Sequence, residues 1–185
     1  SGGVDSSIIT ALAARHTKEL HTYSIGFKDE PAFDETVYSQ MVANHCNTKH
    51  TAFILQDDEL VGALPAMSRN FDEPFADSSA LAVYILSKET RKHVTVSLSG
   101  EGADELFGGY LYFHKAPNPE AFHEETVRKL NKLHLYDCLR ANKSLAAWGI
   151  EGRVPFLDKE FMDIAMQLNP SDKMAGNGKI EKYIL

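Results

Sequence analysis

Hydrophobic and polar positions follow two different periods along the first hundred residues, and these periods predict helices and strands in alternation. Within residues 6–15, the side chains of Ile8, Ile9, Leu12 and Ala13 share one face of a helix. Short apolar runs rich in β-branched and aromatic residues predict strands. Strands that alternate with helices are typical of an α/β fold with a parallel sheet and flanking helices. The predicted strands cover residues 21–27, 50–55 and 94–98, and further helices cover residues 34–45 and 78–92.

Beyond Tyr110 the pattern contains helices alone. They are predicted over residues 119–134, 135–147 and 158–168, and residues 179–185 have the pattern of the start of another. The stretch Gly176-Asn177-Gly178-Lys179 is interpreted as a turn, because no Ser or Thr follows its lysine as a phosphate loop requires. We therefore expect an α/β core over residues 1–110 and a helical portion over residues 111–185.

Composition narrows the class of protein. With 185 residues, of which 43% are hydrophobic and 24% charged, the chain can bury a substantial core. Its formal net charge of −7 argues against a nucleic-acid partner. No apolar run approaches the roughly 20 residues of a membrane span, and no signal peptide is visible, so we expect a cytoplasmic protein without a membrane partner. Cys46 and Cys138 form no C-x-x-C pair and lie in separate predicted helices, so we expect reduced, buried thiols.

The first seven residues, Ser1-Gly2-Gly3-Val4-Asp5-Ser6-Ser7, have the composition of a loop that binds the pyrophosphate end of ATP. Adjacent glycines let backbone N–H groups approach an anion, and the helix that follows would point its positive end at the phosphates. Asp5 would repel a phosphate unless a divalent cation lay between them, which predicts Mg²⁺. The residues fit neither a Walker A loop nor a dinucleotide fingerprint. The plainer interpretation is a Ser/Gly turn before an ordinary helix.

A second polar segment, residues 97–110, follows the predicted strand at 94–98. It holds three acids and four glycines, and its position after a strand places it at the same sheet edge as the opening loop. Asp104 is therefore expected to join Asp5 as a magnesium ligand. The alternative is an acidic start to a short helix, with Asp104 and Glu105 solvated in its first turn.

The opening loop also bears on the extent of the chain. In an open parallel sheet a phosphate loop lies at the carboxyl end of a strand, and we expect such a first strand before Ser1. The sequence is accordingly expected to be a fragment of a longer chain.

Three segments carry a resemblance to a known family. The opening loop resembles the SGGxDS loop of the N-type ATP pyrophosphatases, whose PP-loop domains have the adenine nucleotide alpha-hydrolase-like fold. Residues 97–110, with the sequence SLSGEGADELFGGY, resemble the signature of the synthetase domain of glutamine-hydrolysing asparagine synthetases. Residues 135–143 and 149–158 resemble downstream motifs of the same domain, so the likeness covers essentially the whole chain.

The resemblance implies a reaction and a role for each matching residue. Aspartate would attack ATP to give β-aspartyl-AMP and pyrophosphate, and ammonia from an N-terminal glutaminase domain absent from this sequence would then give asparagine and AMP. Glu101 would orient aspartate or accept a proton from ammonia, and Asp137 and Arg140 would assist it. ATP and pyrophosphate would be held by Ser1, Gly2, Gly3, Asp5, Ser6, Ile25, Ser99 and Gly100, with Mg²⁺ on Asp5 and Asp104.

Two other functions stay open at this point. A β-lactam synthetase or lasso-peptide cyclase would also adenylate an acid and close an amide, but Glu101 favours an asparagine synthetase, because β-lactam synthetases place a tyrosine there. A non-catalytic nucleotide-binding module is the other. Asp77 or Ser78 is expected to cap the helix at 78–92, and that helix end could alternatively bind the α-carboxylate of aspartate. The nitrogen source is undecided, and the resemblance leaves a homodimer open.

Overall fold

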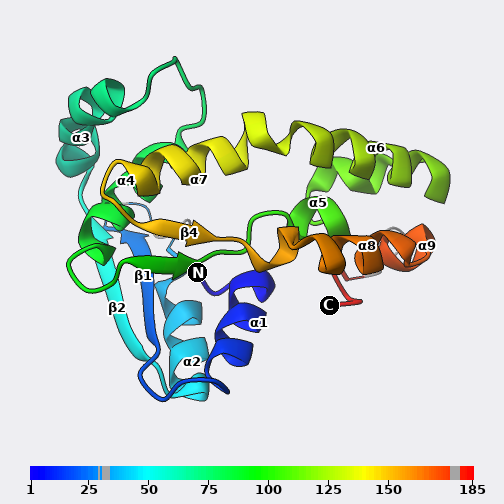
Figure 1. Cartoon of the computed structure of the whole chain (residues 1–185), viewed down its shortest axis with the longest axis horizontal. Helices are drawn as coiled ribbons and strands as arrows, with labels where there is room; N and C mark the ends of the chain where they lie inside the picture. Colours follow the sequence, from blue (N-terminus) through cyan, green and yellow to red (C-terminus); the bar gives the residue numbers. More distant parts are fainter. Residues whose placement is uncertain (29, 31–33, 176–179) are drawn as a thin grey trace. The chain divides into compact units, whose positions relative to one another are not determined.

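The fold is taken from a computed structural model that describes residues 1–28, 30, 34–175 and 180–185. The chain forms two compact units. Unit 1 comprises Ser1–Leu98 and Arg140–Arg153, and unit 2 comprises Ser99–Leu139 and Val154–Leu185. Figure 1 shows their elements coloured along the sequence. The expected division into a core over residues 1–110 and a helical portion over 111–185 stays a prediction about domains.

The strands of unit 1 are parallel. β1 (His21–Phe27) pairs with β2 (Lys49–Leu55) over seven residues, with His21 opposite Lys49 and Phe27 opposite Leu55, and the two run side by side in Figure 1. β3 (Val96–Leu98) pairs with β4 (Glu151–Arg153). The α/β class with parallel strands is confirmed. The prediction of a single sheet is wrong for the described residues, whose strands form two separate two-stranded sheets.

Helices cover both faces of the β1 and β2 pair. α1 (Val4–Ala13) packs on α2 (Thr36–Cys46), and α2 and α4 (Ser79–Thr90) both contact β1. Successive strand residues point to opposite faces, and Ser24 faces α2 while Ile25 lies on the face toward α4. The N-cap residue of α2 is Glu35, whose side chain makes no capping hydrogen bond, while the backbone N–H of Thr36 donates to Asp34 Oδ1 at 2.9 Å.

One helix of unit 1 had no counterpart in the sequence patterns. α3 (Asp57–Asn70) contains Pro65 and begins with a capping box between Gln56 and Glu59. α3 packs on α4, and the end of α7 (Asp137–Ala146) joins them. The core at this junction is built from Phe71, Ala80, Tyr84 and Trp148, and the rings of Tyr84 and Trp148 lie 5.2 Å apart. This packing fixes the course of α7 in unit 1.

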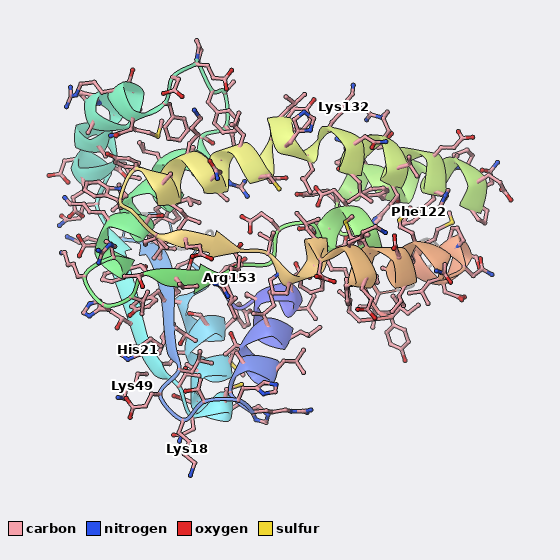
Figure 2. The ribbon with its side chains drawn as sticks, viewed as in Figure 1. Lys18, His21, Lys49, Phe122, Lys132 and Arg153 are labelled. Carbon is pink, nitrogen blue, oxygen red and sulfur yellow. The ribbon has the colours of Figure 1, made fainter. Side chains whose placement is uncertain are left out.

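Unit 2 is helical, as the pattern beyond Tyr110 predicts. Its centre is Phe122, which is 1% exposed and whose ring lies 5.1 Å from that of Phe113. Figure 2 labels two residues of α6: Phe122, which is buried, and Lys132, which is exposed at the end of the helix. Asn118 and Asp158 cap α6 and α8 through their side-chain oxygens. The elements are α5 (Ala103–Phe107), η2 (Leu111–Lys115), α6 (Pro119–Lys132), η3 (Leu133–Leu135), η4 (Pro155–Leu157), α8 (Lys159–Gln167) and α9 (Pro170–Lys173).

Three smaller expectations have mixed outcomes. Residues 181–184 form a turn and not the start of a helix, while the segment Gly176–Lys179 lies outside the described residues. Cys46 and Cys138 are reduced and lie in separate helices as expected, but both are half-buried and not buried. No helix in the described parts of the chain has the length and apolarity needed to cross a bilayer.

Candidate functional site

The opening loop is closed by its own hydrogen bonds. α1 begins at Val4, two residues before the predicted start, so Asp5 lies in its first turn. Ser6 Oγ donates to the carbonyl oxygen of Ser1 at 3.0 Å, and Ser7 Oγ donates to that of Gly3 at 2.7 Å. The backbone N–H of Gly3 donates to Ser1 Oγ at 3.2 Å. The hydroxyls therefore fix the loop directly in front of the positive end of a helix.

Packing against α2 requires a glycine at position 2, whether or not an anion binds the loop. A Cβ built on Gly2 would overlap Cβ of Tyr38, and it would lie 2.9 Å from the carbonyl carbon of Tyr38 and 3.0 Å from the backbone nitrogen of Ser39. Two of these three atoms are backbone atoms of α2 and cannot rotate away. By contrast, a Cβ on Gly3 would meet only Ser1 Oγ, at 3.3 Å. The first glycine thus seats the loop on α2, whereas the second leaves space in front of the helix.

A pocket of about 550 Å³ lies within unit 1, between β1, α3 and α4. Apolar side chains such as Ile25, Leu60 and Val83 form much of its wall. Serine hydroxyls and three carboxylates supply the polar groups, and these include Ser1, Ser79, Glu30, Glu35 and Asp57. Ser1 and Ile25, predicted from different parts of the sequence to contact ATP, line the same pocket. A cavity of this size that combines apolar walls with polar and charged groups is typical of a site for a small ligand.

Arg140 extends from α7 to Ser79, a residue that lines this pocket. Its Nη1 donates to Ser79 Oγ at 3.0 Å and to Asp77 Oδ2 at 3.1 Å. The sequence predicted that Asp77 or Ser78 caps α4, and it is Asp77 Oδ1 that accepts the backbone N–H of Ser79 at 2.9 Å. Arg140 therefore contacts a residue that lines the pocket, which places a cation beside the polar wall.

The acidic segment of unit 2 is shaped by Gly102 and Gly108. Both have positive φ angles, +93° and +67°, which side chains rarely adopt, and they bracket the five-residue helix α5. A Cβ on Gly102 would also overlap the side chain of Leu157. Glu101 is half-buried in the turn before α5. Ser99 Oγ is buried and has no hydrogen-bond partner among the described residues.

The acids of α5 differ in their surroundings. Asp104 Oδ1 lies 2.5 Å from Nζ of Lys182, whose side chain is only 11% exposed. Glu105 is 3% exposed, so the expectation that it is solvated is wrong. Burial raises the pKa of Glu105 to about 7, and the neighbouring charges of Asp137 and Asp104 add to the effect. The short helix of the alternative interpretation is present as α5, but its second acid, Glu105, is buried.

Tyr110 connects this group to the predicted catalytic Asp137. Its hydroxyl donates to Asp137 Oδ2 at 3.2 Å. Burial raises the pKa of Tyr110, and the charges of Glu105 and Asp137 raise it further, so the hydroxyl keeps its proton as a donor. Sequence patterns did not single out Tyr110, Lys182 or the Asp77 contact, because each acts through a partner distant in sequence.

The predicted site residues fall into two sets. In unit 1, Ser1 and Ile25 share the pocket and Arg140 reaches it through Ser79. No three His, Cys, Asp or Glu side chains in the described ranges are grouped to hold a metal ion, and Asp5 and Asp104 belong to different units. The joint magnesium site therefore stays a prediction. Unit 1 holds Ser1, Gly2, Gly3, Asp5, Ser6, Ile25 and Arg140, and unit 2 holds Ser99, Gly100, Glu101, Asp104 and Asp137.

Known proteins resemble the chain over its full length. A profile of the asparagine synthase family matches residues 1–120 and 116–185. Asparagine synthetase B (glutamine-hydrolysing) of Escherichia coli strain K12 is 45% identical over 202 residues, which cover 100% of this chain and 36% of that protein. The glutamine-hydrolysing asparagine synthetase 2 of Oryza sativa subsp. japonica is 42% identical over 200 residues, which cover 100% of the chain and 33% of that protein. The chain thus spans about a third of the length of these relatives, 36% and 33%.

The two matched segments overlap at residues 116–120 and together cover the chain. The residues that carry it include both the opening loop and the segment around α5. The chain belongs to the asparagine synthase family.

Proposed function

We propose that the protein makes asparagine from aspartate, ATP and ammonia. A side-chain carboxylate oxygen of aspartate attacks the α-phosphorus of ATP, the bond to the pyrophosphate oxygen breaks, and β-aspartyl-AMP forms. Ammonia then attacks the activated carbonyl carbon, loses a proton, and AMP leaves with the carboxylate oxygen. Membership of the family supports the reaction, and the shared pocket of Ser1 and Ile25 supports the binding of ATP.

The opening loop and α1 are proposed to bind the pyrophosphate end of ATP. The closed hydrogen bonds of the loop support this, because a loop that is already ordered loses little entropy when an anion binds. Ile25 would contact the adenine from the apolar wall of the pocket. Ser99 and Gly100 are also proposed to contact the nucleotide.

Glu101, Asp137 and Arg140 are proposed to handle aspartate and ammonia. Glu101 would orient aspartate or take the proton that ammonia loses. Arg140 would hold an anionic group of a substrate, which its place beside Ser79 supports. Asp137 is proposed to be held by the Tyr110 hydroxyl at 3.2 Å.

Asp5 and Asp104 are the residues that would hold Mg²⁺. Their hard carboxylate oxygens suit this ion, which usually takes one or two protein carboxylates and keeps several waters. Asp104 would have to leave or share its ion pair with Lys182. When bound, the ion would neutralise charge on the pyrophosphate.

The wider context of the domain is part of the proposal. The PP-loop type of the α/β fold is proposed from the opening loop, and an N-terminal glutaminase domain is proposed as the source of ammonia. The names of the relatives as glutamine-hydrolysing enzymes support the second point. A cytoplasmic location and a homodimer stay predictions.

The shared pocket carries the proposal, and the choice of acid tests it. Full-length protein would be incubated with ATP, ammonia and one of aspartate, glutamate or a β-amino acid, and the release of pyrophosphate would be followed. We expect release with aspartate alone, with asparagine and AMP formed in equal amounts. Equal release with glutamate, or with a β-amino acid as in a β-lactam synthetase, would overturn the assignment.

A further inference from the structure

Asp77, Ser79 and Arg140 form a closed ring of hydrogen bonds. Ser79 Oγ donates to Asp77 Oδ1 at 2.6 Å, and Arg140 Nη1 donates to both Ser79 Oγ and Asp77 Oδ2. A guanidinium can only donate and an ionised carboxylate can only accept, so the direction of the Ser79 hydroxyl proton is set. Each member of the ring thereby restricts the orientation of the other two.

The charge of Asp77 persists at neutral pH in this ring. Burial works to raise its pKa, but the hydrogen bonds from Ser79 and the positive charge of Arg140 outweigh burial and hold the pKa below its ordinary value. Arg140 is 18% exposed and Asp77 34% exposed, so water screens the pair only in part.

The ring also lies where orientation matters. Ser79 lines the 550 Å³ pocket together with Ser1 and Ile25. One turn after Arg140 on α7, Ser144 is fully buried and its Oγ donates to the carbonyl oxygen of Ala80, which holds α7 against α4. The backbone of Arg140 is therefore fixed by packing, and Asp77 fixes the end of its long side chain.

From this geometry we infer that Asp77 is a positioning residue, which holds the Arg140 guanidinium against Ser79 of the pocket wall so that it meets an anionic group of a substrate. The inference rests on the proposed function, since that function gives Arg140 its anionic ligand. Asp77 itself touches no substrate in this account. Its contribution passes entirely through Arg140, and this makes the role separable from its cap on α4.

The chain offers a matched control on the same helix. Lys143, one turn after Arg140, forms an ion pair with Asp72, whose side chain is 81% exposed. Neither Asp72 nor Lys143 lines the pocket. Asp72→Asn thus removes a charge that pairs with the same helix, α7, from the same segment before α4, without touching the ring.

The test is a double-mutant cycle in the full-length protein. Asp77→Asn removes the charge, but the amide oxygen can still accept the N–H and hydroxyl of Ser79, so the cap of α4 is kept. Dissociation constants of ATP and of aspartate would be measured by calorimetry, and asparagine formation would be measured in parallel. We expect binding of one of these ligands to weaken about tenfold in Asp77→Asn, as the loss of a charge-assisted contact implies.

The second arm of the cycle separates positioning from structure. In an Arg140→Gln background, Asp77→Asn is expected to cause no further loss of binding, and Asp72→Asn is expected to change binding less than twofold in either background. A loss that persists in Arg140→Gln, or binding in Asp77→Asn no weaker than in Asp72→Asn, would overturn the inference. If wild-type protein binds ATP but makes no asparagine, the proposed function fails while the cycle still decides the role of Asp77.

Discussion

Replacing Gly2 by alanine tests whether the opening loop is held by packing on α2 or is shaped only by its ligand. The added Cβ would overlap the side chain of Tyr38 and press on two backbone atoms of α2 at 2.9 and 3.0 Å. Overpacking of this kind costs about 1–3 kcal/mol, and backbone neighbours favour the upper end. Alanine recovers about 0.5–1 kcal/mol by restricting the unfolded chain. The net expectation is a loss of about 2 kcal/mol for opening of this region.

Hydrogen exchange of the full-length protein without nucleotide measures this loss locally. A change of about 2 kcal/mol corresponds to roughly 30-fold faster exchange of the α2 amides. Gly62→Ala is the control, because Gly62 lies inside α3 and a Cβ there would meet nothing within 4 Å. There alanine should slow exchange in α3 about fivefold, a gain of about 1 kcal/mol. If Gly2→Ala left α2 exchange unchanged while ATP binding was lost, the packing argument would be refuted.

Three further predictions concern other parts of the chain. Gly3→Ala should weaken ATP binding at least tenfold while thermal unfolding shifts little, since its Cβ meets only Ser1 Oγ at 3.3 Å; equal ATP affinity, measured by calorimetry, would contradict the loop assignment. Phe122→Ala should cost about 3–5 kcal/mol, with Leu at this position costing much less, and a thermal melting shift of under a degree would show that unit 2 is not built around this ring. His50 hydrogen-bonds Thr22 at 2.9 Å and Ser24 at 3.1 Å, and burial lowers its pKa below 6.5. Stability that is complete above pH 6.5 should therefore fall below it, as the unfolded chain takes up a proton, by up to about 1.4 kcal/mol per pH unit; His50→Gln should flatten this slope, and an unchanged slope in denaturation at pH 5 to 7 would count against it.

Local sequence patterns predicted those helices and strands whose signal lies within their own residues. β1 has the predicted bounds, because Tyr23, Ile25 and Phe27 alternate with small residues in the pattern of a strand. α3 was missed, since Pro65 and a high content of charge obscure its apolar face, although the Gln56 and Glu59 capping box marks its start. β4 is a strand only because it pairs with β3, and no pattern within three residues could indicate that.

Prediction of the candidate site was limited in the same way, to residues that form a motif within one segment. The opening loop and Glu101 were visible as motifs, because their residues are adjacent in sequence. The partner of Arg140 lies 63 residues away at Asp77, and only the packing of α7 on α4 brings the two together. Glu105 was expected in solvent, but the five residues of α5 leave it 3% exposed beside Leu106 and Phe107, both of which are buried.

The most direct test of the central claim follows an oxygen atom. Full-length protein would be supplied with ATP, ammonia and aspartate labelled with ¹⁸O in its side-chain carboxylate, and the AMP would be analysed by mass spectrometry. Attack of that carboxylate on the α-phosphorus, followed by displacement of AMP, predicts one ¹⁸O atom in each AMP and none in pyrophosphate. Unlabelled AMP, or label in inorganic phosphate formed together with ADP, would contradict the account.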